Sequence, residues 1–211
     1  MRVSAEGNQP PVPGSELSVE TTHLAAGEPL ECGADDEDTI VFLCTPEDGV
    51  THLVLAGERA TVTNAGDATA ALRASIGAGA DRHAPMGQRE RTVVRGQVDA
   101  ESATGKRSFE VLFGPHNGST RATLFIGHVP PGAAPWHFHL YDEIVWIWRG
   151  EGSFHTRDCS EPLAPGSAFR IRPREAHIVE NTSATEELVV VGLFTPAGSP
   201  SAAYLAPEVV T

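Results

Sequence analysis

Two histidines and a glutamate in one short segment could bind a metal. His137 and His139 are separated by one residue, and Glu143 follows soon after them. Because side chains of a β-strand alternate between its faces, histidines at i and i+2 point to the same side. In one straight strand Glu143 would lie ~20 Å from His137, at ~3.3 Å per residue. The carboxylate can therefore join the histidines only if the chain turns at 140–142, where Asp142 is a favourable turn residue.

A third histidine could complete the site. His177 lies in the segment 169–181, which reads FRIRPREAHIVEN. Neutral imidazoles and carboxylates suit divalent first-row metal ions. Three histidines and one glutamate would leave room on an octahedral ion for water, substrate or dioxygen.

The first segment resembles the first motif of the cupin superfamily. That motif runs Gly, His-x-His, three residues, Glu, six residues, Gly. It falls here on Gly132, His137, His139, Glu143 and Gly150, with one residue fewer than usual after Gly132.

The segment around His177 resembles the second cupin motif, which runs Gly, five residues, Pro-x-Gly, two residues, His, three residues, Asn. It falls here on Gly166, His177 and Asn181. Arg172 and Arg174 stand where the motif has Pro and Gly, so the turn before the histidine is expected to rest on its neighbours, Pro173 and Glu175.

The resemblance implies that His137, His139, Glu143 and His177 bind one divalent transition metal per chain. The metal could be Fe, Ni, Mn, Cu or Zn, because affinity alone does not select among them. The alternative is a barrel whose histidines are ordinary buried groups. Retention of all four ligands favours the metal.

The chain also contains an internal repeat. A shift of 105 residues places His23-Leu-Ala-Ala-Gly27 over His128-Val-Pro-Pro-Gly132, and 39–43 over 144–148. This pattern indicates a duplication, and the chain resembles a two-domain cupin, or bicupin. We therefore expect an all-β protein with two cupin barrels, each a double-stranded β-helix or jelly roll.

The repeat and the Gly- and Pro-rich segments suggest where the domains begin and end. We expect a flexible N-terminal arm at 1–14, a degenerate cupin domain at 15–90 and a metal-binding cupin domain at 91–211. A short helix is expected at 201–205, near the C-terminus.

The first half lacks most of the ligands. Cys32, Ala34 and Asp38 stand at the positions of the first-motif ligands, and Ala60 stands at that of the third histidine if Asn64 matches the motif asparagine. Two potential ligands with an alanine between them make a poor site. We expect a barrel without metal that supports the other one, and leave open whether Cys32 and Asp38 keep any affinity.

Strand alternation predicts the surroundings of the metal. If Glu143 faces inward, Val145 and Ile147 do so too, and Val179 does the same near the third histidine. These residues would form a dry, substrate-binding wall. Trp146 and Trp148 would face outward and need a cover, from the first half or from a second chain.

Two polar residues are candidates for contact with substrate. Arg172 alternates with Arg170, and an inward arginine would bind a carboxylate or enolate by charge-assisted hydrogen bonds. A surface arginine is the alternative. Tyr141 lies in the turn between ligands and could donate a hydrogen bond to substrate or simply pack.

The composition and net charge limit the classes of partner that this protein is expected to bind. The 211 residues carry a net charge of -13, which disfavours nucleic acid and an anionic membrane surface as partners. No stretch approaches the ~20 apolar residues that cross a bilayer. Three cysteines without a close pair do not form a disulfide framework, so a cytoplasmic location is expected. A homodimer is a possible assembly.

The resemblance to quercetinase-like cupins implies an oxidoreductase, a dioxygenase acting on a small organic enol or phenol, with Glu143 as the catalytic base. The same site could instead act as a Lewis acid in an isomerase, decarboxylase, lyase or aminohydrolase. A non-enzymatic cupin that binds a small molecule is the remaining class.

Overall fold

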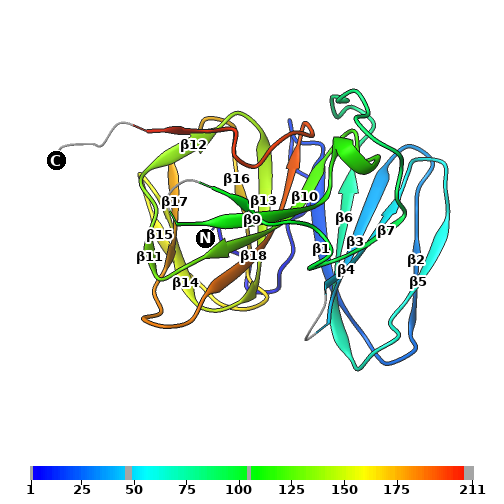
Figure 1. The fold of residues 1–211 in the computed structure, drawn as a ribbon, viewed down its shortest axis with the longest axis horizontal. Helices are drawn as coiled ribbons and strands as arrows, with labels where there is room; N and C mark the ends of the chain where they lie inside the picture. Colours follow the sequence, from blue (N-terminus) through cyan, green and yellow to red (C-terminus); the bar gives the residue numbers. More distant parts are fainter. Residues whose placement is uncertain (1, 46–48, 104–105, 207–211) are drawn as a thin grey trace.

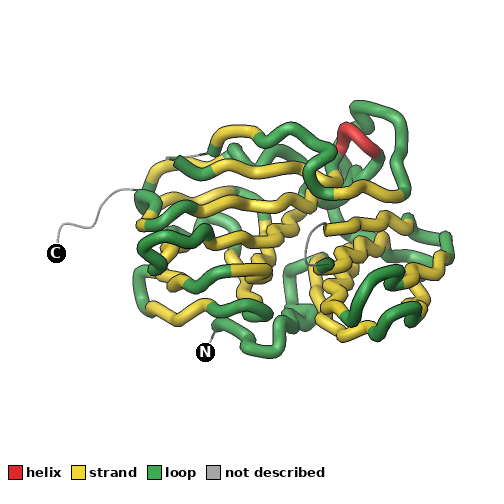
Figure 2. Tube along the Cα trace, turned by 60° about the horizontal axis from the view of Figure 1, so that its bottom comes forward, coloured by secondary structure: helices red, strands yellow, loops and turns green. Residues whose placement is uncertain are grey.

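The chain folds into two groups of β-strands that lie side by side. The structure is a computed structural model that describes residues 2–45, 49–103 and 106–206. Figure 1 shows the strands of the first half, in blue and cyan, next to those of the second half. In the described residues one 3-10 helix, η1 (Pro115–Asn117), is the sole helical segment, drawn red in Figure 2. The expected all-β fold with two barrels is confirmed.

The first barrel has a large sheet and a small one. The large sheet has the strand order β1-β6-β3-β4-β7, and β2 pairs with β5 in the small one. The strands are β1 (Leu17–Leu24), β2 (Pro29–Cys32), β3 (Asp38–Cys44), β4 (Gly49–Val54), β5 (Ala60–Thr63), β6 (Thr69–Ile76) and β7 (Thr92–Val94). Because β7 pairs with β4, the first sheet extends past residue 90, where we expected the domain to end.

The second barrel has two larger sheets. One has the order β16-β13-β18-β10-β9-β8, and the other has the order β15-β14-β17-β12-β19, with β11 also paired to β17. The strands are β8 (Glu101–Ser102), β9 (Ser108–Phe113), β10 (Thr123–Val129), β11 (Gly132–Ala133), β12 (His137–His139), β13 (Asp142–Arg149), β14 (Gly152–Thr156), β15 (Ser160–Leu163), β16 (Ala168–Ile171), β17 (His177–Asn181), β18 (Leu188–Thr195) and β19 (Ala203–Leu205).

The C-terminal segment is a strand and not the short helix expected at 201–205. In β19, Ala203 pairs with His139 and Leu205 pairs with His137, so the segment adds an edge strand to β12. Backbone hydrogen bonds to an open sheet edge outweigh the weak helical preference of so short a segment.

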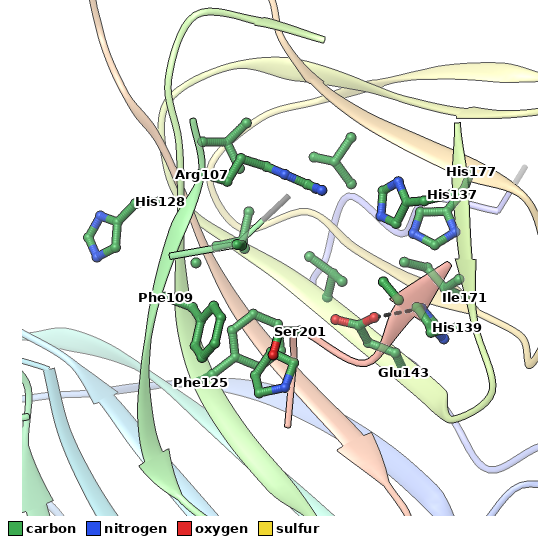
Figure 3. A pocket seen from close by; sticks show the side chains of 18 of the residues that line it. Arg107, Phe109, Phe125, His128, His137, His139, Glu143, Ile171, His177 and Ser201 are labelled. Atoms are coloured by element: carbon green, nitrogen blue, oxygen red, sulfur yellow. Dashed lines mark ion pairs between the residues drawn. The ribbon is translucent and has the colours of Figure 1, made fainter. Parts of the chain in front are cut away.

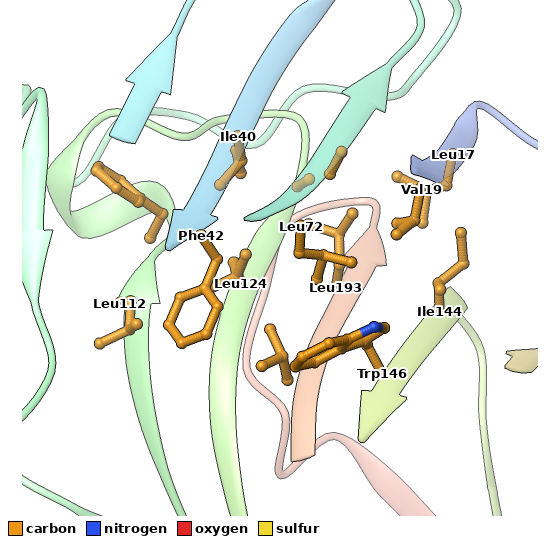
Figure 4. Packing of buried hydrophobic residues seen from close by; sticks show 14 of the residues in the cluster. Leu17, Val19, Ile40, Phe42, Leu72, Leu112, Leu124, Ile144, Trp146 and Leu193 are labelled. Carbon is orange, nitrogen blue, oxygen red and sulfur yellow. The ribbon is translucent and has the colours of Figure 1, made fainter. Parts of the chain in front are cut away.

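The largest hydrophobic core lies between the two barrels. Its buried side chains come from β1, β3, β4 and β6 of the first barrel and from β9, β10, β13 and β18 of the second (Figure 4). Trp146 and Trp148, which we expected to need a cover, are buried there, and the ring of Phe42 meets Trp148 edge-on at 5.1 Å. The first half of the chain supplies the cover.

The N-terminal segment is packed along the barrels, contrary to the flexible arm expected at 1–14. Ser4 forms a β-bridge with Ala168, and Gln9 forms one with Val19. Val3 is buried in the core of the second barrel. These backbone pairs and the burial of an apolar side chain hold the segment in place.

The repeat is visible in the pairing of the strands. Cys32 pairs with Ala60 in the first barrel just as His137 pairs with His177 in the second. The alignment of the two halves therefore places the lost ligands correctly.

The two motif asparagines make matching hydrogen bonds. The Asn64 side chain donates to the carbonyls of Leu24 and Asp67, and the Asn181 side chain donates to those of Val129 and Glu186. Each side-chain oxygen also accepts from the backbone N–H two residues later. Both asparagines thus tie the end of a strand to the same place in their barrel.

Candidate metal centre

The four expected ligands come from three strands that face one cavity. His137 and His139 lie on β12 and His177 lies on the neighbouring strand β17, while Glu143 lies on β13 of the opposite sheet. The chain turns between β12 and β13 at residues 140–141, as the sequence predicted. All four side chains are buried and point into the same space (Figure 3).

The imidazoles are close together and the carboxylate touches one of them. The ring centroid of His177 lies 4.3 Å from that of His137 and 5.1 Å from that of His139. The Glu143 Oε2 atom lies 2.8 Å from His139 Nε2. Across the described residues, however, no three histidine, cysteine or acidic side chains could hold a metal ion exactly as they stand. Metal binding would therefore require these side chains to move.

The local backbone fixes which nitrogen of each histidine faces the cavity. Nδ1 of His137 lies 3.0 Å from the carbonyl oxygen of Pro135, and Nδ1 of His139 lies 2.8 Å from that of Tyr141. Nδ1 of His177 lies 2.8 Å from the carbonyl oxygen of Glu175. Because a carbonyl oxygen can only accept a hydrogen bond, each Nδ1 must carry the hydrogen and donate the bond. Each Nε2 then carries a lone pair, as in histidines that bind metals.

The short contact between His139 Nε2 and the Glu143 carboxylate requires a positively charged group between the two atoms. Nε2 of His139 is buried and makes no hydrogen bond, although the carboxylate oxygen is near. A nitrogen lone pair and a carboxylate oxygen repel each other at this distance, so a proton or a metal ion must lie between them. Two ligand atoms that each lie ~2.1 Å from a metal ion, with a right angle between their bonds to it, are ~3.0 Å apart. The distance between His139 Nε2 and Glu143 Oε2, 2.8 Å, is close to this value. The residues present therefore fit a metal.

Burial keeps two of the histidines neutral near pH 7. It lowers the pKa of His137 to about 4, and the Arg107 guanidinium lowers this pKa further. Burial also lowers the pKa of His177 well below its ordinary value, with His137 as the next cause. Neutral imidazole is the form that binds a metal.

Three of the five expected substrate-binding residues line the cavity, whose volume is about 100 Å³. Val145 and Val179 lie in its wall, as alternation predicted. Tyr141 also lines it, but its hydroxyl donates to the carbonyl of Pro200. Its ring stacks on His139 at 3.9 Å. Tyr141 thus holds a histidine in place and does not offer its hydroxyl to substrate.

Two expected substrate-binding residues lie outside the cavity. Ile147 faces inward, but it is packed deeper in the barrel core with Phe154 and does not reach the cavity. Arg172 is exposed, because β16 ends at Ile171 and the strand alternation ends with it. The buried Arg170 binds the Asp142 carboxylate at 2.7 Å and is not available to substrate.

Arg107 is a lining residue that the sequence did not reveal. It directly precedes β9, and its side chain reaches into the cavity toward His137 and His177 (Figure 3). Phe109 and Phe125 line the cavity on the side away from these histidines. Arg107 belongs to no ligand motif, and its place at the cavity depends on sheet packing, so no pattern in the sequence marked it.

In the first barrel an ion pair has taken the place of the metal ligands. Asp38, the counterpart of Glu143, is buried and accepts a hydrogen bond from the backbone N–H of Ala56. The guanidinium of Arg121, from the second half, lies 3.2 Å from its carboxylate. The Asp38 carboxylate thus forms an ion pair that joins the two barrels.

Comparison with known families identifies the type of domain to which part of the second half belongs. Residues 125–194 match the family described as cupin domain. This part of the second barrel is a cupin domain. The matched segment contains all four candidate ligands. A search of curated proteins found no match to the sequence.

Solved structures share the fold of most of this chain. AerE from Microcystis aeruginosa is 10% identical with a TM-score of 0.68, and the match covers 86% of this chain and 88% of AerE. An IolB-like protein from Salmonella typhimurium is 12% identical with a TM-score of 0.67, covering 91% of this chain and 88% of that protein. A mutant of Bacillus subtilis oxalate decarboxylase is 11% identical with a TM-score of 0.64, covering 91% of this chain and 71% of that enzyme.

At these identities the comparisons show the fold alone. Because each alignment spans most of this chain, it includes both barrels and not only the cupin domain that the family match identifies. The described residues contain no helix long and apolar enough to cross a membrane.

Proposed function

We propose that this protein is a metal-dependent cupin enzyme with one metal ion at His137, His139, Glu143 and His177. The observation that carries this proposal is the orientation of the three imidazoles. Each donates an Nδ1–H hydrogen bond to a nearby carbonyl, which leaves a lone pair on its Nε2, and the Nε2 of His139 lies 2.8 Å from the buried Glu143 carboxylate. The positions of the ligands in a cupin domain support the same assignment.

We propose further that the enzyme is a dioxygenase acting on a small organic enol or phenol. A divalent transition metal would supply Lewis acidity, and a redox-active one would also transfer electrons to dioxygen. The chain supplies the base, because the Glu143 carboxylate lines the cavity and can accept the proton of a substrate hydroxyl. Val145, Ile171 and Val179 line the same space and exclude water from it.

Metal content tests the site. Protein purified without a chelating tag is expected to contain about one equivalent of a transition metal by plasma mass spectrometry, and His137→Ala is expected to lose it. His155→Ala is the matched control, because His155 contacts Glu180 and does not line the cavity. No metal after reconstitution with Fe, Ni, Mn, Cu or Zn, or equal metal in His137→Ala, would overturn the proposal.

Oxygen uptake tests the reaction. The metal-loaded protein is expected to consume dioxygen with at least one member of a panel of enols and phenols, and His137→Ala is expected not to. If the protein holds zinc and consumes no dioxygen, the site acts as a Lewis acid, in isomerase, decarboxylase, lyase or aminohydrolase chemistry. Absence of uptake with a redox-active metal bound would overturn the dioxygenase assignment.

A further inference from the structure

The cavity has a single strong cation at its polar end. Arg107 is the only arginine or lysine among the described residues that line it. Figure 3 shows the guanidinium extending toward His137 and His177 from the opposite wall. Any ligand that reaches the candidate metal centre therefore passes beside this group.

The charges of the cavity favour an anionic ligand. Glu143 is the one carboxylate among the described lining residues, and it offsets the charge of Arg107. His128 also lines the cavity, but its two nitrogens contact Glu110 and Glu187 at 3.1 and 2.8 Å. A divalent ion at the histidines would leave an excess of positive charge in a small buried space. An anion is the ligand that compensates such an excess.

The other end of the cavity is apolar and aromatic. Phe109 and Phe125 pack edge to face with ring centroids 6.3 Å apart, and both line the cavity together with Val190. Phe109 and Phe125 belong to a separate apolar cluster that also contains Phe194. The volume of about 100 Å³ is small, since a cavity of ~150 Å³ takes up benzene. The apolar part of a ligand must therefore be compact.

We infer that the cavity binds an organic carboxylate with a compact apolar body. The Arg107 guanidinium holds the carboxylate, and Phe109 and Phe125 contact the body. A guanidinium presents two parallel N–H donors that match the two oxygens of a carboxylate. This inference rests on the proposed function and refines it, because the substrate becomes an enol or phenol that also carries a carboxylate.

Calorimetric titration with four simple probes tests the inference without any turnover. Isobutyrate and pivalate carry the carboxylate on compact apolar bodies, and isobutyramide and pivalamide are their neutral isosteres. We expect the protein as purified to bind at least one acid at least tenfold more tightly than its amide. Arg107→Met is expected to weaken binding of that acid at least tenfold and to leave binding of the amide unchanged.

Matched variants separate this effect from a general loss of structure or charge. Arg172→Met removes an exposed arginine outside the cavity and is expected to bind like the wild type. Arg107→Lys keeps the charge without the two parallel donors and is expected to bind the acid with intermediate affinity. Equal melting temperatures and equal metal content in all variants show that the fold is intact.

The outcomes distinguish this inference from the proposed function. If metal binds but Arg107→Met holds the acids as tightly as the wild type does, the inference is overturned and the metal centre stands. If no metal binds but the preference for acids depends on Arg107, the metal centre fails and the carboxylate site stands. If neither acid binds to the wild type at millimolar concentration, the inference is overturned.

Discussion

The orientation of each candidate histidine ligand is set by residues close to it in the sequence. His137, His139 and His177 each donate Nδ1 to a carbonyl only two residues away. Such bonds form as soon as the strand and its turn form, and they need no distant partner. The lone pairs are therefore aimed at the cavity by the local chain, which prepares the site before any ligand enters.

The low pKa of His137 predicts how stability depends on pH. Between its unfolded pKa, near 6.5, and its folded pKa of about 4, the unfolded chain binds more protons than the native protein. Stability of the metal-free protein is therefore expected to fall as pH falls through this window, and His177 acts in the same direction. Urea unfolding in EDTA at several pH values measures this slope.

A glutamine at position 137 is the variant for this measurement. His137→Gln cannot gain the proton, so its stability is expected to fall less steeply between pH 6.5 and 4 than that of the wild type. His155→Gln, at a partly exposed site outside the cavity, is the control and is expected to follow the wild type. Identical slopes for wild type and His137→Gln would show that the histidine is not held neutral by burial.

The four candidate ligands could be named from the sequence, but much of their surroundings could not. Their spacing resembles the two cupin motifs, and that resemblance marked the four side chains. Arg107 was missed and Arg172 was wrongly placed in the cavity. The positions of both side chains depend on where a strand begins or ends. Arg107 lies just before β9 and points into the cavity, whereas Arg172 lies just after the end of β16 and no longer follows the alternation of that strand.

Among the elements, the turn between β16 and β17 carries the clearest sign of backbone strain. Arg174 is the only described non-glycine residue with a positive φ, at 65°. Its backbone N–H donates to the carbonyl of His139 at 2.7 Å, so the turn also holds strand β12. The resemblance to the second cupin motif places a glycine at this position, and the backbone keeps the conformation that glycine adopts easily.

We expect Arg174→Gly to stabilise the protein by up to about 1 kcal/mol. The left-handed conformation costs ~1–2 kcal/mol for a residue with a Cβ, and the greater freedom of glycine in the unfolded chain offsets part of the gain. Urea unfolding measures the change. Arg172→Gly, in the same turn without a positive φ, is expected to be neutral or destabilising. A loss of stability in Arg174→Gly would contradict this account.

Which strands pair with one another was harder to predict from the sequence than the all-β fold itself. β7 follows the expected domain boundary and still completes the first sheet. β19 was expected to be helical and instead pairs with β12. Both strands are only three residues long, so their structure is decided by an available sheet edge and not by their own sequence.

At the scale of the whole molecule, the two barrels share their main core. Phe42 of β3 is fully buried and packs against Trp148 of β13. The buried pair between Asp38 and Arg121 adds a charged link across the same boundary. Neither barrel can keep its large sheet covered without the other.

Phe42→Ala is expected to lower the free energy of unfolding by about 3–5 kcal/mol, the usual cost of removing a buried phenylalanine ring. Because the core is shared, both barrels are expected to unfold in one transition, in the variant as in the wild type. Calorimetry measures the midpoint and shape of this transition. Two resolved transitions, with only one shifted in Phe42→Ala, would show that the barrels are independent.

The burial of the tryptophans also determines the intrinsic fluorescence of the protein. Trp146 and Trp148 lie in the core between the barrels, and the third tryptophan, Trp136, directly precedes the ligand strand β12. Two of the three fluorophores thus sit in an apolar environment at the boundary, where their emission is shifted to the blue. A red shift of the intrinsic fluorescence would signal separation of the barrels, while quenching at Trp136 would signal events beside the cavity.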